Sequence, residues 1–206
     1  MPLMPKPLII LTADKDALYG VRELVRRPDD LGIGSVEFDC YPHPRHDCGV
    51  FKEAHEFLRA FLKWDHAVVL FDREGCGQED RTCEDLEDIV ERRLAANGWD
   101  DRAKAVVLDP ELECWIWDSS LQVNRVLGWT HTRDLDRWLC ERGFPLGTDG
   151  KPQRPKEAFA AALRYQNRHP SSALFQDLGK AFRSSGCSER SFLRFRNALQ
   201  RWFPPV

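Results

Sequence analysis

Residues 66–74, HAVVLFDRE, decide the fold of this chain. Their apolar, β-branched run is short and is followed at once by the turn Gly75-Cys76-Gly77, which is typical of a buried strand. Buried strands of this kind belong to parallel sheets, in which helices cover both faces. Asp72 and Glu74 lie two residues apart at the carboxyl end, on one side of the strand, where open α/β sheets place their chemistry. Like charges held close together repel, so the pair predicts a bound cation, most simply Mg²⁺; the alternative is an Asp that only caps the next loop.

Outward from this strand, the chain alternates between strand and helix patterns. Alternation of this kind predicts an α/β fold, with a mostly parallel sheet flanked by helices. Strands are expected at 7–13, 35–41, 66–71 and 103–108, and helices at 14–27, 50–64 and 79–97. After residue 121 only helices are expected, at 132–142, 155–167, 172–184 and 189–203. The Gly- and Pro-rich segment 143–155 predicts a linker, so we expect an α/β domain over 1–142 and an α-helical C-terminal extension over 143–206.

The composition is that of a globular protein of one domain, or of one domain with an appendage. The chain has 206 residues, of which 42% are hydrophobic and 31% are charged. No apolar stretch approaches the roughly 20 residues of a membrane helix, and the N-terminus lacks the features of a signal peptide. We therefore expect a cytoplasmic protein without a membrane partner. The seven cysteines are odd in number and contain no CxxC pair, which favours reduced structural thiols.

The charge is distributed unevenly along the chain. The net charge is −3, but residues 151–206 hold eleven Lys/Arg and three Asp/Glu, a balance of +8, and the first 150 residues therefore carry −11. A basic tail on an acidic body indicates either a polyanion or acidic partner for the tail, or an attraction between the two halves. Both interpretations are open at this point.

Acidic residues follow three of the expected strands. Because parallel strands all end at the same edge of a sheet, these side chains are expected to converge there, and one or two Mg²⁺ ions could then bind a phosphodiester and activate water. The alternative is that some of them cap helices, as Asp14 does in a helix start of this kind. The three groups are Asp14 and Asp16, then Asp72 and Glu74, then Asp109, Glu111 and Glu113.

Two rival sites are weaker. The segment YPHPRHDCGVFKEAH offers His43, His46, Cys48 and His55 as zinc ligands, but the His46-x-Cys48 spacing is too tight for an ordinary zinc finger and no second close pair follows. Cys76 follows the acidic motif, yet the surrounding acids disfavour a thiolate there. A polar loop and a structural cysteine are the plainer interpretations.

The chain resembles Toprim domains, the metal-binding α/β module of topoisomerases, primases and nucleases of the overcoming-lysogenization-defect type. It is most similar to a group of small bacterial Toprim-like proteins. The segments that carry the resemblance are LTADKD at 11–16, FDRE at 71–74, PELECWIW at 110–117, RPKEAF at 154–159 and the segment from Cys187 to Phe192. The ADKD turn also resembles accessory components of methylation-associated antiphage defence systems.

The resemblance implies a function and a set of site residues. It implies a cytoplasmic, bacterial antiviral defence component with Mg²⁺- or Mn²⁺-dependent, nuclease-like chemistry on nucleic acid, and other defence proteins as partners. The catalytic residues are then Asp14, Asp16, Asp72 and Glu74, and the metal ligands are Asp72, Glu74 and Glu113. Thr12 stands where Toprim nucleases carry a Glu, so a catalytically degenerate binding or assembly subunit is the alternative.

The basic tail supplies the predicted nucleic-acid contacts. Phe192, Phe195, Leu199 and Trp202 form the apolar face of the last helix, while its arginines lie elsewhere on it and can hold phosphates or the acidic body. Trp115 and Trp117 are expected in the core, with base stacking as the alternative for Trp115. The residues predicted to bind nucleic acid are Lys151, Arg154, Lys156, Arg190 and Arg194.

Overall fold

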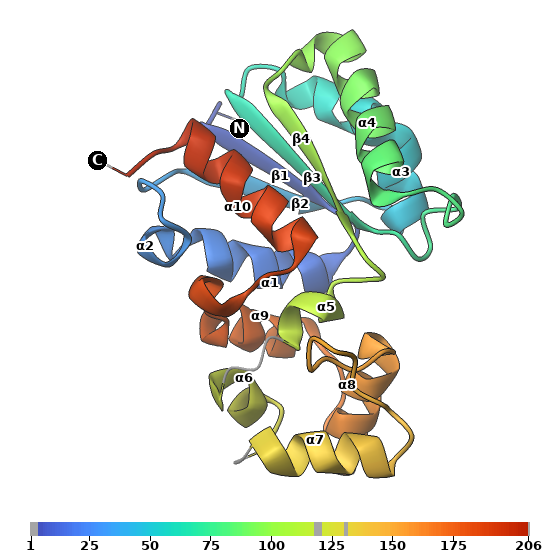
Figure 1. The fold of residues 1–206 in the computed structure, drawn as a ribbon. Helices are drawn as coiled ribbons and strands as arrows, with labels where there is room; N and C mark the ends of the chain where they lie inside the picture. Colours follow the sequence, from blue (N-terminus) through green and yellow to red (C-terminus); the bar gives the residue numbers. More distant parts are fainter. Residues whose placement is uncertain (1–3, 118–120, 130–131, 206) are drawn as a thin grey trace.

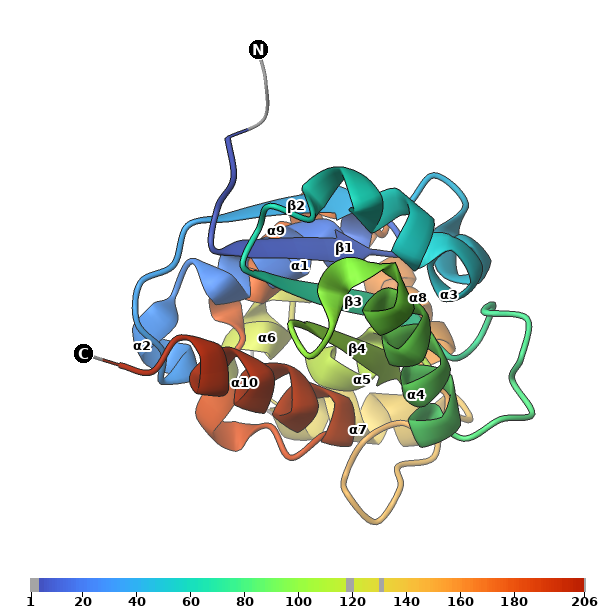
Figure 2. The same ribbon diagram turned by 90° about the horizontal axis from the view of Figure 1, so that it is seen from above.

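The computed structural model describes residues 4–117, 121–129 and 132–205, and it contains a four-stranded, fully parallel sheet (Figure 1). The strands lie in the order β2-β1-β3-β4, which Figure 2 shows from above. Leu8 of β1 is aligned with Phe38 of β2 and with His66 of β3, and Asp72 of β3 is aligned with Leu108 of β4. The predicted α/β fold is confirmed. The strands are β1 (Leu8–Thr12), β2 (Phe38–Pro42), β3 (His66–Asp72) and β4 (Ala103–Leu108).

The apolar strands separate two hydrophobic cores. Successive side chains of a strand point to opposite faces, so Val68 and Leu70 join one core while Val69 and Phe71 join the other. Helices α3 and α4 cover the face of Val69. Helices α1 and α10 cover the face of Val68, and α9 packs on the outer side of α1. The bounds of these helices are α1 (Lys15–Val25), α3 (His46–Phe57), α4 (Cys83–Leu94), α9 (Ser172–Ala181) and α10 (Arg190–Trp202).

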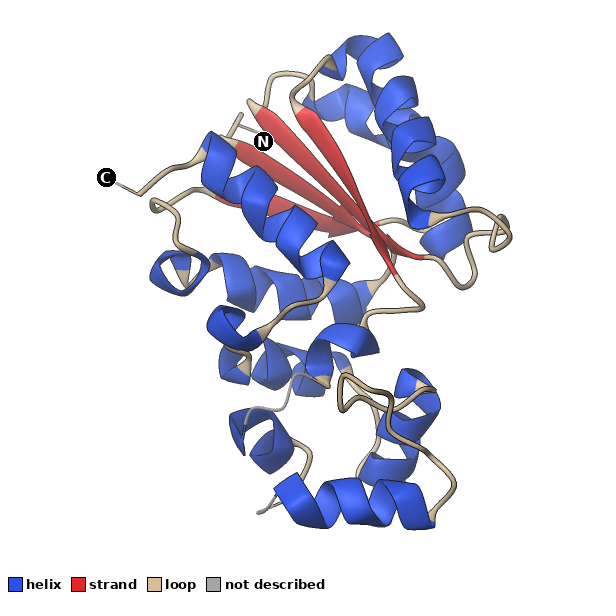
Figure 3. Ribbon diagram, viewed as in Figure 1, coloured by secondary structure: helices blue, strands red, loops and turns tan. Residues whose placement is uncertain are grey.

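The part of the chain between β4 and α9 consists of helices and loops, which lie beyond the carboxyl ends of the strands (Figure 3). It contains α5 (Glu113–Ile116), α6 (Leu121–Val126), α7 (Thr132–Glu141) and α8 (Pro155–Tyr165). The short helix α2 (Pro28–Leu31) and single turns at Leu58–Phe61, Ala95–Trp99 and Ser184–Gly186 complete the described elements. Within the described residues, no helix combines the length and the apolar character needed to cross a membrane.

Most predicted elements are present, with shifted ends. Asp14 caps α1, as expected, because its Oδ1 accepts a hydrogen bond from the Ala17 backbone N–H at 2.8 Å. Helix α4 begins four residues later than predicted, because the Thr82 hydroxyl caps it and the acidic residues before it belong to a loop. The short helices α2, α5 and α6 were not predicted, since four to six residues are too few to show a helical period.

The basic C-terminal helix α10 forms ion pairs with the acidic helix α4. The buried Glu87 carboxylate accepts two hydrogen bonds from the Arg190 guanidinium, at 3.0 and 2.5 Å, and Arg194 pairs with Glu91 at 2.7 Å. The two glutamates also accept the backbone N–H groups of Val107 and Ala105, each at 3.0 Å. These ion pairs hold the basic and the acidic part of the chain together. The Glu87 and Glu91 side chains also satisfy backbone N–H groups of the edge strand β4, which would otherwise be free to bind a further strand.

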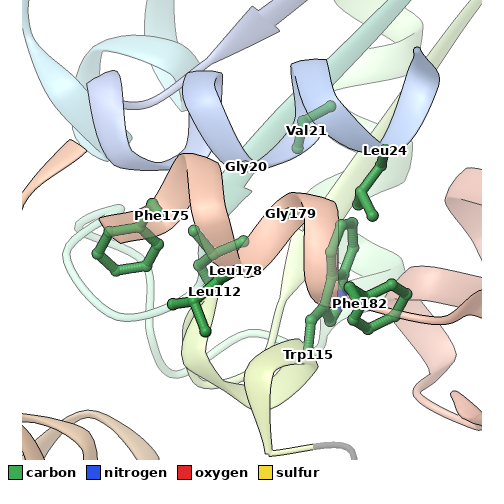
Figure 4. Close-up of a pocket in the computed structure, with 9 residues that line it drawn as sticks. All are labelled: Gly20, Val21, Leu24, Leu112, Trp115, Phe175, Leu178, Gly179 and Phe182. Atoms are coloured by element: carbon green, nitrogen blue, oxygen red, sulfur yellow. The ribbon is translucent and has the colours of Figure 1, made fainter. Parts of the chain in front are cut away.

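Helices α1 and α9 approach closely at Gly179 of α9, whose missing side chain leaves room for the backbone of α1 at Gly20. A Cβ at Gly179 would lie 2.5 Å from the backbone oxygen of Gly20, which is too close for a carbon atom. Figure 4 shows the two glycines beside a small apolar hollow of about 30 Å³. Such a hollow holds at most a water or two, and its lining of Leu112, Trp115 and Phe175 offers little hydrogen bonding to water. We therefore interpret it as a packing gap in the core.

The two glycines give a matched test of this packing. We expect Gly179→Ala to lower the free energy of unfolding by about 1–3 kcal/mol, because the methyl group forces α9 away from α1. Gly20→Ala should leave it unchanged or raise it by up to about 1 kcal/mol, because its Cβ meets only Phe175 O, at 3.7 Å, and alanine favours the helix. Urea unfolding of both variants measures the difference; equal effects would contradict the described contact.

Candidate metal centre

The candidate site lies where the strand order reverses. The chain passes from β1 to β2 on one side and then crosses over to β3 on the other side of β1. The carboxyl ends of β1 and β3 therefore border a crevice, the usual ligand position in an open α/β sheet. Asp14 follows β1 after one residue, and Asp72 is the last residue of β3. The fold thus brings at least one acid from the first and from the second predicted group to the same place.

A cavity of about 80 Å³ occupies this crevice. Its volume leaves room for an ion with a few water molecules. Apolar side chains from β3, from β4, from the N-cap of α5 and from α9 form its walls, among them Leu70, Leu108, Leu112 and Phe175. Its charged lining consists of Asp14, Asp16, Asp72, Glu113 and Lys156.

Asp72 is held in place by backbone groups. Its Oδ1 accepts a hydrogen bond from the Leu112 N–H at 3.1 Å, and its own N–H donates to Asp47 Oδ1 at 2.7 Å. Burial, followed by the neighbouring charges of Asp47 and Glu113, raises the pKa of Asp72 well above its usual value. The side chain is therefore fixed in position and is poorly stabilised in its charged form.

Glu113 is the second strongly perturbed acid of the cavity. It opens the short helix α5 and is only 7% exposed. Burial, together with the nearby Glu111, raises the pKa of Glu113 to about 7. The charge of Glu113 in turn raises the pKa of Asp72. A cation that reached both carboxylates would relieve this cost.

Asp14 and Asp16 occupy the entrance to α1. Asp14 caps the helix, which occupies its Oδ1. The Ser172 hydroxyl at the start of α9 donates to Asp16 Oδ1 at 2.8 Å. Burial raises the pKa of Asp16, while this hydrogen bond opposes the shift. The C-terminal helices therefore take part in positioning the acids of the cavity.

Lys156 is the cation of this acidic region. It lies in the first turn of α8, and its Nζ is 2.7 Å from Oε2 of the buried Glu111. Burial alone would lower the pKa of Lys156, but the bond to Glu111 and the charges of Glu113 and Asp72 raise it. Lys156 was predicted to bind nucleic acid from the tail, and the structure places it beside the acids instead.

Other predicted site residues lie outside the cavity. Glu74 is exposed and does not line it; only its backbone N–H is engaged, with Pro110 O at 3.2 Å. Asp109 faces Arg73, at 3.3 Å between Nε and Oδ1. Asp47 was not proposed as a ligand, although it touches Asp72. Its position soon after β2 was the available signal, because that strand ends at the same edge.

The predicted nucleic-acid residues have partners within the protein. Lys151 Nζ is 2.5 Å from Glu189 Oε1, and the Arg154 guanidinium donates to Gly143 O at 3.1 Å and lies over the Phe144 ring. Arg190 and Arg194 bind α4, as described above. Their contact with nucleic acid stays a prediction.

The aromatic residues and cysteines of the sequence motifs are structural. The Trp115 indole donates to Ser191 Oγ at 2.8 Å and packs against Phe192, and the Trp117 indole donates to Pro155 O at 2.9 Å. Both tryptophans are buried, as predicted. All seven cysteines are free thiols, and the buried Cys76 has a raised pKa because of its desolvation.

The residues of the cavity fit a metal ion held by few protein ligands. Across residues 4–117, 121–129 and 132–205, no three His, Cys, Asp or Glu side chains lie close enough together to hold a metal ion by themselves. This finding concerns the predicted zinc ligands between His43 and His55 as well as the predicted magnesium ligands. Mg²⁺ usually takes one or two carboxylates and completes its shell with water and substrate phosphates. Asp72 and Glu113, two hard oxygen ligands with burial-raised pKa values, suit that role.

Comparison with known proteins finds no family model, no curated protein and no solved structure that matches this chain.

The raised pKa of Glu113 predicts that stability depends on pH. The folded protein keeps the Glu113 proton up to about pH 7, whereas the unfolded chain loses it near 4.5. Stability is therefore lost as the pH rises through this window, by on the order of 3 kcal/mol for this group. Because Glu113→Gln removes the charge, we expect it to raise the free energy of unfolding near pH 8 and to change it little near pH 5, without divalent ions.

Urea unfolding at both pH values measures this effect. Glu157→Gln is the matched control, because Glu157 is an exposed acid in the first turn of the adjacent helix α8. A Glu113→Gln protein that is less stable than the parent near pH 8 would show that the charged, buried Glu113 carboxylate does not lower the free energy of unfolding.

Proposed function

We propose that this protein is a Toprim-like component of a prokaryotic antiphage defence system, and that its acidic cavity binds Mg²⁺ or Mn²⁺ for phosphodiester cleavage in nucleic acid. One observation carries the proposal. Asp72 and Glu113 come from separate elements, line the same cavity at the switch point of the sheet, and both have pKa values raised by burial. Acidic side chains with strongly raised pKa values in a crevice are typical of functional sites.

The residues of the cavity have different roles in this proposal. Asp72 and Glu113 would hold the cation, which when bound polarises a phosphate and lowers the pKa of a water molecule. Asp16, fixed by Ser172, is placed to orient that water as a hydrogen-bond acceptor. Lys156 has an ammonium group beside these acids and would bind a phosphate oxygen through charge. The protein thus positions the phosphate, the water and the negative charges around one point.

A second function is favoured by Thr12. Its side chain is fully buried and donates to the backbone oxygen of Asp14 at 2.9 Å, so no carboxylate stands where Toprim nucleases carry their Glu. This observation favours a catalytically degenerate subunit that binds a cation or nucleic acid and assembles with other defence proteins. Flanking methyltransferase, helicase or nuclease genes would support either version of the defence assignment.

A cleavage assay separates the two functions. We expect the purified protein to nick plasmid DNA or to cleave RNA with Mg²⁺ or Mn²⁺, and Asp72→Ala to abolish the activity, because it removes a metal ligand. Glu74→Ala is the control, since Glu74 lies outside the cavity. Cleavage that survives Asp72→Ala would remove this cavity from the mechanism. Cation binding without cleavage would support the degenerate subunit.

A further inference from the structure

A second hollow lies on the helical part of the molecule, away from the acidic cavity. It has a volume of about 380 Å³ and lies between α7, α8 and the loop that joins them. A volume of this size is ordinary for a small-ligand site. The groove is lined by Trp138, Arg142, Phe144, Ala161, Arg164 and Tyr165.

The aromatic side chains of the groove are open to solvent. Tyr165 is 54% exposed, one of three large apolar or aromatic side chains with such exposure among the described residues. Its ring stacks on Trp129 with centroids 5.5 Å apart and contacts Trp138 at 5.0 Å. The supporting rings hold Tyr165 in place and leave part of its surface free. An exposed, well-supported ring is a platform for another flat group.

The groove also carries unbalanced positive charge. Within the part of the chain that the structure describes, no carboxylate pairs with Arg142 or Arg164. Arg142 lies over the Trp138 and Tyr165 rings, at 5.5 and 5.9 Å from their centroids. Arg154 lies over the Phe144 ring and donates only to a backbone carbonyl. Arg190 and Arg194 of α10, by contrast, are engaged with Glu87 and Glu91.

We propose that this groove binds single-stranded nucleic acid, with a base stacked on Tyr165 and phosphates on Arg142 and Arg164. The groove combines an exposed aromatic ring with arginines that pair with no carboxylate among the described residues, the two kinds of group that bind the bases and phosphates of a single strand. A duplex hides its base faces and offers only phosphates to such a groove. An acidic peptide would use the arginines but not the aromatic surface. The inference rests on the proposed function, because it names the substrate class of the acidic cavity.

Helix α8 connects the groove to the cavity. Lys156 lies in its first turn beside the acids, and Tyr165 is its last residue. At 1.5 Å per residue, the two positions are about 14 Å apart along the helix axis. Nine residues at 3.6 per turn also place the two positions on opposite sides of the helix axis, so a strand that contacts both Tyr165 and Lys156 must pass around α8.

Binding of a fluorescent dT oligonucleotide, in EDTA and at several salt concentrations, tests the groove separately from catalysis. We expect Tyr165→Ala to weaken binding about tenfold through lost stacking, and Tyr165→Phe to preserve it. Arg142→Ala and Arg164→Ala should each reduce the slope of log K against log salt by about 0.7, the value for one phosphate on a single strand. Arg59→Ala, an exposed arginine beside α3, should change nothing.

Several outcomes would overturn the proposal. The proposal is wrong if the protein does not bind the oligonucleotide, or if it binds duplex DNA equally well or poly-glutamate more tightly. It is also wrong if the Tyr165→Ala and Arg164→Ala variants bind the oligonucleotide as the parent protein does. Asp72→Ala keeps the groove intact and should bind normally in EDTA. Loss of cleavage with retained binding therefore concerns the cavity alone, and loss of binding with retained cleavage of short substrates concerns the groove alone.

Discussion

The central constraint in this protein is electrostatic. A parallel sheet ends all its strands at one edge, and here that edge gathers several carboxylates around one small cavity. The charge of Glu113 raises the pKa of Asp72, and Glu111 raises that of Glu113. The ammonium group of Lys156, beside these acids, opposes both shifts. Carboxylates whose pKa values are raised in this way cost stability when they are charged, which is the basis of the proposed cation site.

The C-terminal segment completes the site as well as the fold. Helix α8 supplies Lys156, and α9 supplies the Ser172 hydroxyl that fixes Asp16. Helix α10 shares a core with the sheet and neutralises the buried Glu87 of α4. Loss of this segment would remove Lys156 and the Ser172 hydroxyl from the surroundings of the cavity, together with part of one face of the core. Part of the basic charge of the tail is accordingly used in internal pairs, those of Arg190 and Arg194 with α4, whereas Arg164 of α8 has no carboxylate partner among the described residues.

Local sequence patterns predicted the bounds of the strands better than they predicted which residues line the cavity. The strand of Ala103–Leu108 was predicted to the residue, and the Asp72 strand within one residue, because a short buried run bounded by turns has few alternatives. Whether an acidic residue lines the cavity depends on the direction that the chain takes after the strand ends. Glu74 lies on the turn that leaves the strand and points to solvent. Asp47 contacts Asp72, which is 25 residues away in sequence, and Lys156 contacts Glu111, which is 45 residues away. No local sequence pattern reveals such contacts.

The most direct test of the central claim is calorimetric titration with Mn²⁺ near pH 6.5, in two buffers with different ionisation enthalpies. Binding at Glu113 must displace the proton that burial keeps on this carboxyl near pH 6.5. The account predicts a saturable site that releases about one proton per cation, with less release by Glu113→Gln and no binding by Asp72→Ala. Absence of binding, or binding without proton release that both variants retain, would contradict it.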